Sequence, residues 1–555
     1  MERVTREVAL WCAIAILAGA PRLVRLDFLL TNAEATTALT SLAMLRGEPA
    51  VFSNPLFGWL QMLLFAVFGA SEVSARLVPA LSGIAVCLLP AMLRSQLGRT
   101  RALIFALLLA LSPTLWFVSR EMGGAMLAWA LAFAAYCAWR ADRPTPAAAA
   151  LGALLATGSD AAAPLIVTIL ASRVTSPPAS VRVSARTAAI LLLAFVSSAT
   201  ALLMRPSGLG DAFNGYASWA QSLGSGGSAS VGRLMLGLVT SELVALVGAA
   251  FAFAVFSRTP ALARSEAAWL VWIAAGFGLL VVTPGRNAAL LTPLVIGLAG
   301  LASAAYDALF ASVQRRATWR REGVIAGAAF VLLIYAGLGV WHYAGQGRST
   351  WLISVVIAAL LIVALAAAGS LSVDYGVPLR GIALAGIAVL SLYSLAAGIQ
   401  MNHARPHNPA EPYRIQAAAL GLEALQESIQ LASARATGEP NALGVHIAGD
   451  SPAALQWALR DQRRFDANGD AGSVGIVLTP SPEKPKAAGN FIGMAYEVTA
   501  QAPLNEVRCI GLPQGGFDCL PLVRWLAFRD VDDVRTDLWV FWLRDDVARR
   551  VSGER

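Results

Sequence analysis

Long apolar runs alternate with short polar stretches from residue 8 to residue 398 of the chain. Many of these runs are near the roughly 20 residues with which a helix crosses the hydrocarbon core of a bilayer. Because lipid offers no hydrogen-bond partners to the backbone, each run is expected to form a helix. The pattern therefore predicts an all-α polytopic membrane bundle over residues 1–399.

The sequence changes character after this region. Residues 401–412 read MNHARPHNPAEP, a polar stretch rich in proline and asparagine that is typical of a linker. A helical pattern follows at 413–436, and short β-like runs follow at 443–448, 474–478 and 491–498. This alternation predicts that residues 400–555 form a soluble C-terminal domain of the α/β or α+β type.

The arginine distribution decides two ambiguous segments and the orientation. If cytoplasmic loops carry the excess of arginine, residues 55–70 lie flat at the outer interface and residues 145–172 form a hairpin. The bundle then has about thirteen transmembrane helices, a cytoplasmic N-terminus and an extracytoplasmic C-terminal domain. We therefore expect a multi-pass protein of the plasma or inner membrane, whose first loop (residues 21–77) lies outside and contains interfacial helices, one of them over residues 31–45.

Composition supports the membrane assignment and excludes other classes. Of the 555 residues, 57% are hydrophobic and 14% are charged, against about 25% charged in soluble domains. The net charge of +8 is spread over short loops, so no nucleic-acid partner is expected. A phosphate-binding glycine-rich loop with lysine is missing from the sequence, which argues against ATP-driven transport. The four histidines lack close metal spacing apart from His403 and His407, which are interpreted as solvated linker residues, so no cofactor is assigned and a divalent metal stays open.

Three acids fall on the predicted outer side, namely Glu34, Glu121 and Asp160. A carboxylate there could take a proton from an acceptor hydroxyl. Six basic residues on the same side could hold a phosphate: Arg22, Arg25, Arg120, Arg286, His342 and Arg348. For each of these residues the alternative is structural, because interfacial arginine and glutamate also cap helices or pair with each other. In the C-terminal domain, Cys509 and Cys519 are candidates for a disulfide if that domain is extracytoplasmic.

Four stretches carry a resemblance to a known family. Pro21-Arg22 is followed by the short acidic motif at 32–35 (NAEA), then by residues 47–83, then by LSPTLWFVSRE at 111–121. Over residues 20–175 the chain resembles the membrane glycosyltransferases of the GT-C fold. Within them it is similar to the protein mannosyltransferase and aminoarabinose transferase relatives (family 39). The resemblance implies sugar transfer from a polyprenyl-phosphate carrier on the outer side of the membrane.

A closer similarity is to the prokaryotic group called flippase-activity-associated. It rests on NPAEPYRIQ at residues 408–416 and on a Trp-x-Leu-Arg-Asp element at 457–461. The chain also departs from the family pattern. In the family's Asp-Glu-Ala motif the aspartate expected to be the base falls on Ala33, while Glu34 and Glu121 match acidic positions. Asp160 matches the acid of a later Lys-Glu pair whose lysine is absent, and PGRNAALLTP at 284–293 lacks the expected tryptophan and histidine.

These observations lead to one main hypothesis and two alternatives. The main one is a membrane glycosyltransferase that moves a sugar from a polyprenyl-phosphate donor to a glycan or protein acceptor outside the membrane. Glu34 or Glu121 would act as base or orient the acceptor, with Asp160 nearby, and outward arginines would bind the donor phosphate. The first alternative is a family member without catalysis that serves as a binding or assembly partner in envelope glycan synthesis, motivated by Ala33. The second is a flippase for lipid-linked sugars.

Overall fold

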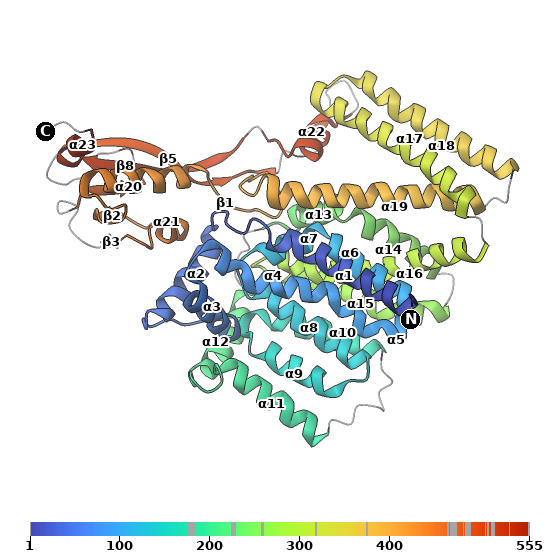
Figure 1. Cartoon of the computed structure of the whole chain (residues 1–555), viewed down its shortest axis with the longest axis horizontal. Coiled ribbons are helices and arrows are strands. Elements are labelled where there is room, and N and C mark those ends of the chain that lie inside the picture. Colours follow the sequence, from blue (N-terminus) through green and yellow to red (C-terminus); the bar gives the residue numbers. More distant parts are fainter. Residues whose placement is uncertain are drawn as a thin grey trace.

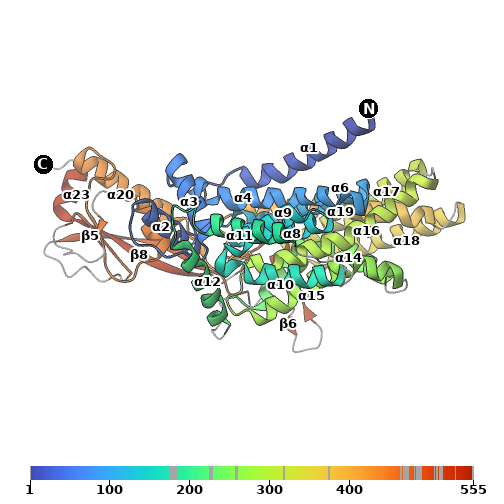
Figure 2. The ribbon, with the colours of Figure 1, turned by 90° about the horizontal axis from the view of Figure 1, so that it is seen from below.

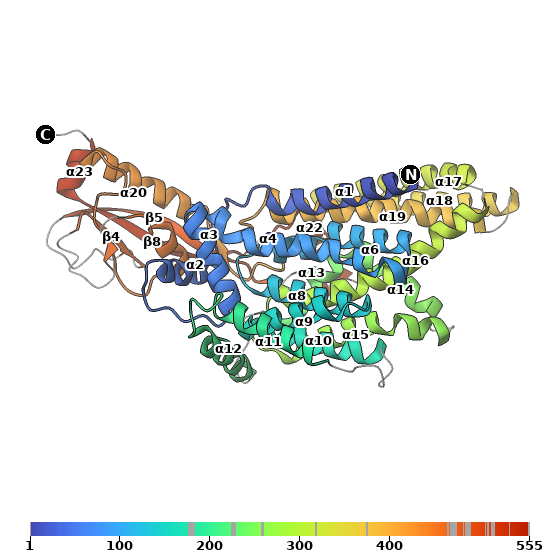
Figure 3. The same ribbon diagram turned by 60° about the horizontal axis from the view of Figure 1, so that its bottom comes forward.

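The computed structural model describes residues 2–175, 184–223, 229–256, 260–316, 319–372, 376–462, 465–466, 474–480, 482, 490–504, 507, 510–511, 517–531 and 533–552. A long helical body carries a small sheet region at one end, and the N-terminus lies toward the opposite end (Figures 1 and 2). Helices α2, α3 and α12 lie at the end that carries the sheet (Figure 3). The first loop and the C-terminal region therefore share one end of the molecule.

The body is built from nineteen described helices, joined by short 3₁₀ turns and by the π-helical residues Gln400–Ala404. They are α1 (Glu2–Leu23), α2 (Asn32–Leu45), α3 (Pro55–Phe68), α4 (Glu72–Leu88), α5 (Arg94–Leu97), α6 (Arg99–Leu111), α7 (Pro113–Arg120), α8 (Ala125–Arg140), α9 (Pro144–Leu155), α10 (Ala162–Thr175), α11 (Ala185–Ala199), α12 (Gly208–Ser222), α13 (Val231–Ser241), α14 (Leu243–Phe256), α15 (Pro260–Val282), α16 (Thr292–Arg316), α17 (Trp319–Gln346), α18 (Leu352–Ser372) and α19 (Gly376–Ile399).

Fewer helices than predicted are long and apolar enough to cross a membrane. Within the described ranges there are five such helices, or up to eight if each of three bent pairs is one span, so the count of about thirteen is not confirmed. One reason is that some apolar runs break inside. The chain bends by 59° between α6 and α7 and by 88° between α13 and α14. Between α9 and α10, in the segment for which a hairpin is predicted, it bends by 119°.

The C-terminal region contains a six-stranded mixed sheet in the order β1-β5-β8-β4-β2-β3. Strand β2 is parallel to β3 and β4, and the other pairs are antiparallel. The strands are β1 (Ala417–Ala418), β2 (Val445–Ile447), β3 (Phe465–Asp466), β4 (Ile476–Thr479), β5 (Phe491–Gln501) and β8 (Arg535–Arg544), and a separate pair is β6 (Ile510–Gly511) with β7 (Phe517–Asp518). The helices are α20 (Gly421–Thr437), α21 (Ala453–Ala458), α22 (Leu520–Phe528) and α23 (Asp545–Ser552). The mixed sheet with its helices agrees with the predicted α/β or α+β type.

The C-terminal region is docked on the first loop through the Trp-x-Leu-Arg-Asp element. The indole Nε1 of Trp457 donates to Glu72 Oε1 at 2.8 Å, and its ring stacks on Phe65 with centroids 5.8 Å apart. Arg460 adds an ion pair of 3.2 Å to the same carboxylate. One apolar cluster contains buried residues of α2, α3 and α4 together with residues of the sheet. Burial of shared apolar surface therefore holds the two parts together.

Candidate functional site

Glu34 lies in the first turn of α2, and its carboxylate is fully engaged. It forms a capping box with Thr31, accepting from Thr31 N at 2.9 Å, and it accepts from Met122 N at 2.9 Å. Arg76 binds both of its oxygens, each at 2.9 Å. Burial opposes ionisation of this carboxyl, but the charge and hydrogen bonds of Arg76, with those from the two backbone amides, hold its pKa below the usual value. Glu34 therefore connects α2 to α4 and to the short loop between α7 and α8.

Arg76 of α4 is the other half of this arrangement and is fully buried. Besides Glu34, it donates to the carbonyl oxygens of Leu26, Phe28 and Leu29 at 2.5–3.1 Å. Its guanidinium also lies 3.6 Å from the centroid of the Phe28 ring. The sequence shows Arg76 only as one more charge of the first loop, and the structure shows that it organises that loop.

Glu121 and Asp160 line one cavity of about 240 Å³ at the same end of the body. Asn54 caps α3 and donates to Asp160 Oδ2 at 2.7 Å, which fixes that carboxylate. We call this cavity the acid cavity. Gly124 also lines it, and a Cβ atom at this position would lie 1.9 Å from Asn54 Nδ2. Only glycine therefore fits without displacing Asn54 and Asp160. Glu34 is not part of the lining, and no arginine, lysine or histidine is found among the described residues that form it. Its other polar members are Thr37, Ser53, Ser159 and Asn287.

Glu121 follows the last residue of α7 and lines the acid cavity. Burial in the surrounding protein raises its pKa to about 8, and the negative charge of Glu34 adds to the rise. The charges of Arg414 and Arg76 act in the opposite direction. A carboxyl that titrates near neutral pH can both accept and release a proton, which suits acid–base chemistry.

None of the six predicted phosphate-binding residues lines the acid cavity. Arg22, Arg120 and Arg286 use their guanidinium groups on backbone carbonyl oxygens. Arg120, for example, donates to the carbonyls of Pro21, Val24 and Arg25. These contacts are the structural alternative that the sequence left open. The other three are exposed: Arg25 lines a second cavity of about 250 Å³, His342 stacks on Trp351 at 4.5 Å, and Arg348 precedes α18.

Two residues that sequence reasoning did not assign to the site lie near it and come from the stretch at residues 408–416. The hydroxyl of Tyr413 lies 2.9 Å from Thr114 Oγ1 and 3.2 Å from Ser241 Oγ, at the breaks between α6 and α7 and between α13 and α14. Arg414 is 6% exposed and lies between the rings of Phe28 and Phe117. Both belong to the NPAEPYRIQ stretch at residues 408–416. The resemblance of that stretch to a known group was the one sequence signal that pointed to these two residues.

The remaining predictions concern cysteines and metals. Cys519 is disulfide-bonded, while its predicted partner Cys509 lies outside the described residues. Cys12, Cys87 and Cys137 are free thiols. In the part of the chain that the structure describes, no group of three or more histidine, cysteine, aspartate or glutamate residues could hold a metal ion.

Comparison with known proteins identifies the fold. No protein-family model matches the sequence, and no curated protein matches it. ArnT from Cupriavidus metallidurans in the apo state matches with a TM-score of 0.52 and 17% identity, over 86% of this chain and 94% of that one. The same ArnT bound to undecaprenyl phosphate matches with a TM-score of 0.53 and 17% identity, over 86% and 93%. The Archaeoglobus fulgidus oligosaccharyltransferase in the apo form follows with a TM-score of 0.43 and 12% identity, over 83% and 64%.

The likeness to ArnT shows that this chain has the GT-C membrane fold over most of its length. With the apolar helices described above, it is a multi-pass membrane protein. The narrower placements in family 39 and in the flippase-activity-associated group remain predictions.

Proposed function

We propose that this chain is a membrane glycosyltransferase. It transfers a sugar from a polyprenyl-phosphate donor to a glycan or protein acceptor on the extracytoplasmic side of the plasma or inner membrane. The observation that carries the proposal is the acid cavity, which Glu121 and Asp160 from two different loops both line. The fold supports it, because ArnT has the same fold and one of its structures holds undecaprenyl phosphate.

In this reaction Glu121 is the base. The ionised carboxylate takes the proton of an acceptor hydroxyl, the freed oxygen forms a bond to the anomeric carbon, and the bond to the carrier phosphate breaks with its electron pair on phosphate. Asp160, held by Asn54, orients the acceptor hydroxyl. Glu121 is preferred to Glu34 for this role because Glu34 is committed to Arg76, Thr31 and Met122.

Charge on the departing phosphate requires a cation. Of the six predicted residues, we assign Arg25 to this task. It is exposed, it lines the second cavity beside Phe28, and its carbonyl oxygen accepts from Arg120, the residue directly before Glu121. The donor phosphate would then lie on the side of Glu121 that faces the linker.

The test is sugar transfer by the full-length protein in membranes. A panel of labelled undecaprenyl-phosphate-linked sugars is supplied, and release of undecaprenyl phosphate is measured together with label in glycan and protein. The unmodified chain should turn over one of these donors, and Glu121→Gln should lower the rate about 100-fold or more. Glu48→Gln, the same change at an exposed position of the first loop, should transfer normally. Undiminished transfer by Glu121→Gln would show that the residue assignment is wrong.

A second candidate function is supported by Ala33 and Glu34 together. Ala33 is exposed in the first turn of α2, where the family pattern has its base, and the neighbouring Glu34 is engaged in structural contacts. A chain of this kind would bind a lipid-linked sugar without turnover and serve as an assembly partner. In the same assay the unmodified protein would then retain donor without releasing undecaprenyl phosphate.

A further inference from the structure

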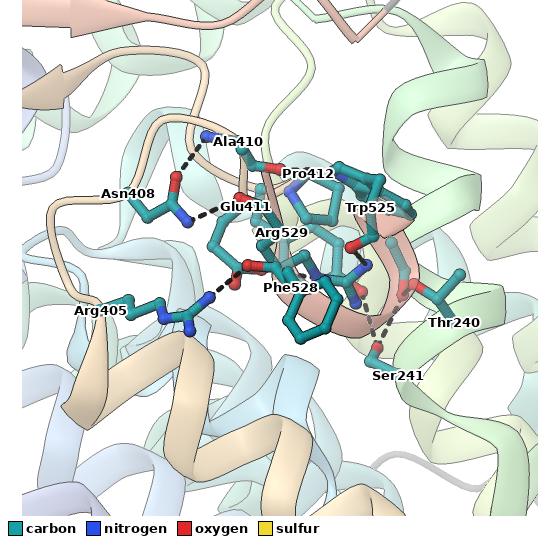
Figure 4. A network of polar contacts seen from close by, with 12 residues as sticks. Thr240, Ser241, Arg405, Asn408, Ala410, Glu411, Pro412, Trp525, Phe528 and Arg529 are labelled. Atoms are coloured by element: carbon teal, nitrogen blue, oxygen red, sulfur yellow. Dashed lines mark hydrogen bonds and ion pairs between the residues drawn. The ribbon is translucent and has the colours of Figure 1, made fainter. Parts of the chain in front are cut away.

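The linker segment (residues 408–416) is fastened to the C-terminal region by its own polar contacts (Figure 4). Asn408 accepts from Ala410 N at 2.9 Å and donates to Arg529 O at 3.0 Å. The indole of Trp525 donates to Ala410 O at 3.0 Å. Arg529 forms an ion pair of 3.5 Å with Glu411. These bonds fix the start of the segment to α22 and the residue that follows it.

The same segment is fastened to the helical body. Arg233 of α13 donates to the carbonyl oxygens of Pro412 at 3.0 Å and of Pro409 and Glu411 at 3.2 Å, and also to that of Arg414. Tyr413 packs on Phe117 of α7 with ring centroids 5.4 Å apart. The backbone of Arg414 is therefore held on both sides, and the direction of its side chain is fixed.

Arg414 brings a charge into the body, and the carboxylates of Glu34, Glu121 and Glu411 act on it without a direct ion pair among the described residues. Its guanidinium carbon lies 5.2 Å from the ring centroid of Phe117 and 5.6 Å from that of Phe28. The Nε atom has no hydrogen-bond partner, and within the described part of the chain the side chain has no ion-pair partner. A buried arginine in this state is costly unless a negative group forms nearby.

The charged groups that act on Glu121 are Glu34, Arg76 and Arg414. Because Arg76 and Glu34 form a bidentate pair, their charges largely cancel. Arg414 is a further positive charge that acts on Glu121, and Glu34 and Glu411 also act on Arg414. It comes from the far end of the chain, so the charge balance of the site depends on the C-terminal region being docked.

We propose that Arg414 is an electrostatic positioning residue, which the C-terminal segment inserts so that Glu121 can carry a negative charge inside the buried site. The inference rests on the proposed role of Glu121 as base. An ionised carboxylate in a desolvated site is stabilised by a nearby cation. The C-terminal region is then a working part of the site, because without Arg414 the pKa of Glu121 would rise further and a smaller fraction of it would be ionised at neutral pH.

The test compares Arg414→Gln, Arg414→Met and Arg414→Lys in the full-length protein. Two quantities are measured against pH: the rate of sugar transfer, and the labelling of the protonated Glu121 carboxyl by a carbodiimide, read by peptide mass spectrometry. Removing the charge should move both midpoints upward by about one unit, which lowers transfer at pH 7 about tenfold. Arg414→Lys should restore most of the wild-type midpoint. Arg435→Gln, the same change at an exposed arginine of α20, should leave it unchanged.

The outcomes separate this inference from the proposed function. Unchanged midpoints in Arg414→Gln and Arg414→Met would overturn the inference, even if transfer falls, because a merely structural role lowers the rate without moving them. If Glu121→Gln transfers sugar normally, the proposed function fails, while the labelling still reports whether Arg414 acts on Glu121. Arg414→Met keeps the apolar contact with both phenylalanine rings, so it supplies the measurement if Arg414→Gln does not fold.

Discussion

The buried pair of Glu34 and Arg76 gives a prediction that does not depend on the reaction. The Glu34 carboxylate accepts from two groups of Thr31, two nitrogens of Arg76 and the amide of Met122. Glu34→Gln removes the charge and turns one acceptor oxygen into an NH₂ donor that faces other donors. Breaking a buried ion pair by removing one partner costs about 3–5 kcal/mol. This is a large share of the roughly 5–15 kcal/mol by which a typical domain is stable.

The assay is a double-mutant cycle of Glu34→Gln, Arg76→Met and the double variant, purified in detergent. Thermal unfolding is followed by tryptophan fluorescence. Each single variant should unfold at a clearly lower temperature, and the double variant should recover part of the loss, because no unpaired charge remains buried. Glu48→Gln is the control at an exposed position. A Glu34→Gln protein that unfolds like the wild type but has lost transfer would refute the structural role and return Glu34 to the position of base.

The pair of Glu34 and Arg76 also predicts how the stability of the folded chain depends on pH. The pKa of Glu34 is lower in the folded chain than its ordinary value of 4.5. Its contribution to stability is therefore fully present above that value and is lost as pH falls through the folded pKa. Acidification below about pH 4.5 should lower the unfolding temperature of the wild type more than that of Glu34→Gln. Parallel curves for the two proteins would contradict the assignment.

Three further predictions concern the acid cavity and the docked domain. The rate of transfer should rise with pH through a midpoint near 8, the pKa of Glu121, since the base acts in its ionised form; a pH–rate profile with its midpoint near 5 would speak against Glu121. Gly124→Ala should lower transfer about 100-fold, because the added Cβ displaces Asn54 and Asp160 beside it. Gly210→Ala in α12, whose Cβ meets open space away from the cavity, should transfer at the wild-type rate. Equal transfer rates in the two variants would show that the cavity tolerates displacement. Trp457→Ala removes the indole hydrogen bond to Glu72 and the stacking on Phe65. This change should weaken docking of the C-terminal region on the first loop by about 2 kcal/mol and speed limited proteolysis of the linker. Unchanged cleavage would mean that other contacts hold the domain.

Local signals in the sequence were enough to predict the position of several helices and strands. The helix predicted over residues 31–45 is observed as Asn32–Leu45, because its capping box and apolar spacing are both local. The predicted β-like runs at 443–448, 474–478 and 491–498 contain or overlap β2, β4 and β5. Strand β8 was missed. Its core, LWVFWL, is a continuous apolar run without alternation, and such a run does not distinguish a buried strand from a helix.

The span count and the site depended on contacts that no local pattern contains. Hydropathy sums over a window, so it does not show that the chain bends by 59° at Ser112, where Pro113 begins a new helix. The sequence placed the three acids on one side of the membrane. It could not show that Arg76, 42 residues away, pairs with Glu34. Nor could it show that residues 408–416 bury Arg414 against Phe28 and Phe117. Those assignments follow from packing between distant segments.

Ala33 offers the last prediction, because its position in α2 is favourable for a carboxylate. It is an exposed residue in the first turn of the helix, where an added negative charge stabilises the helix by about 0.3–1 kcal/mol. Thr37, four residues later and hydrogen-bonded to Ala33 O at 3.1 Å, lines the acid cavity. Residues four apart share a helix face, so an aspartate at position 33 would lie beside that cavity.

We therefore expect Ala33→Asp to fold like the wild type and, in the Glu121→Gln background, to restore part of the lost transfer. Ala33→Asn, which has the same size but no charge, should restore none. Unfolding temperature and release of undecaprenyl phosphate are the two measurements. Transfer that appears only after Ala33→Asp, with none in the unmodified chain, would overturn the role of Glu121 as base. It would also identify the natural protein as a binding partner, because its cavity would then lack only the one carboxylate that the reaction needs.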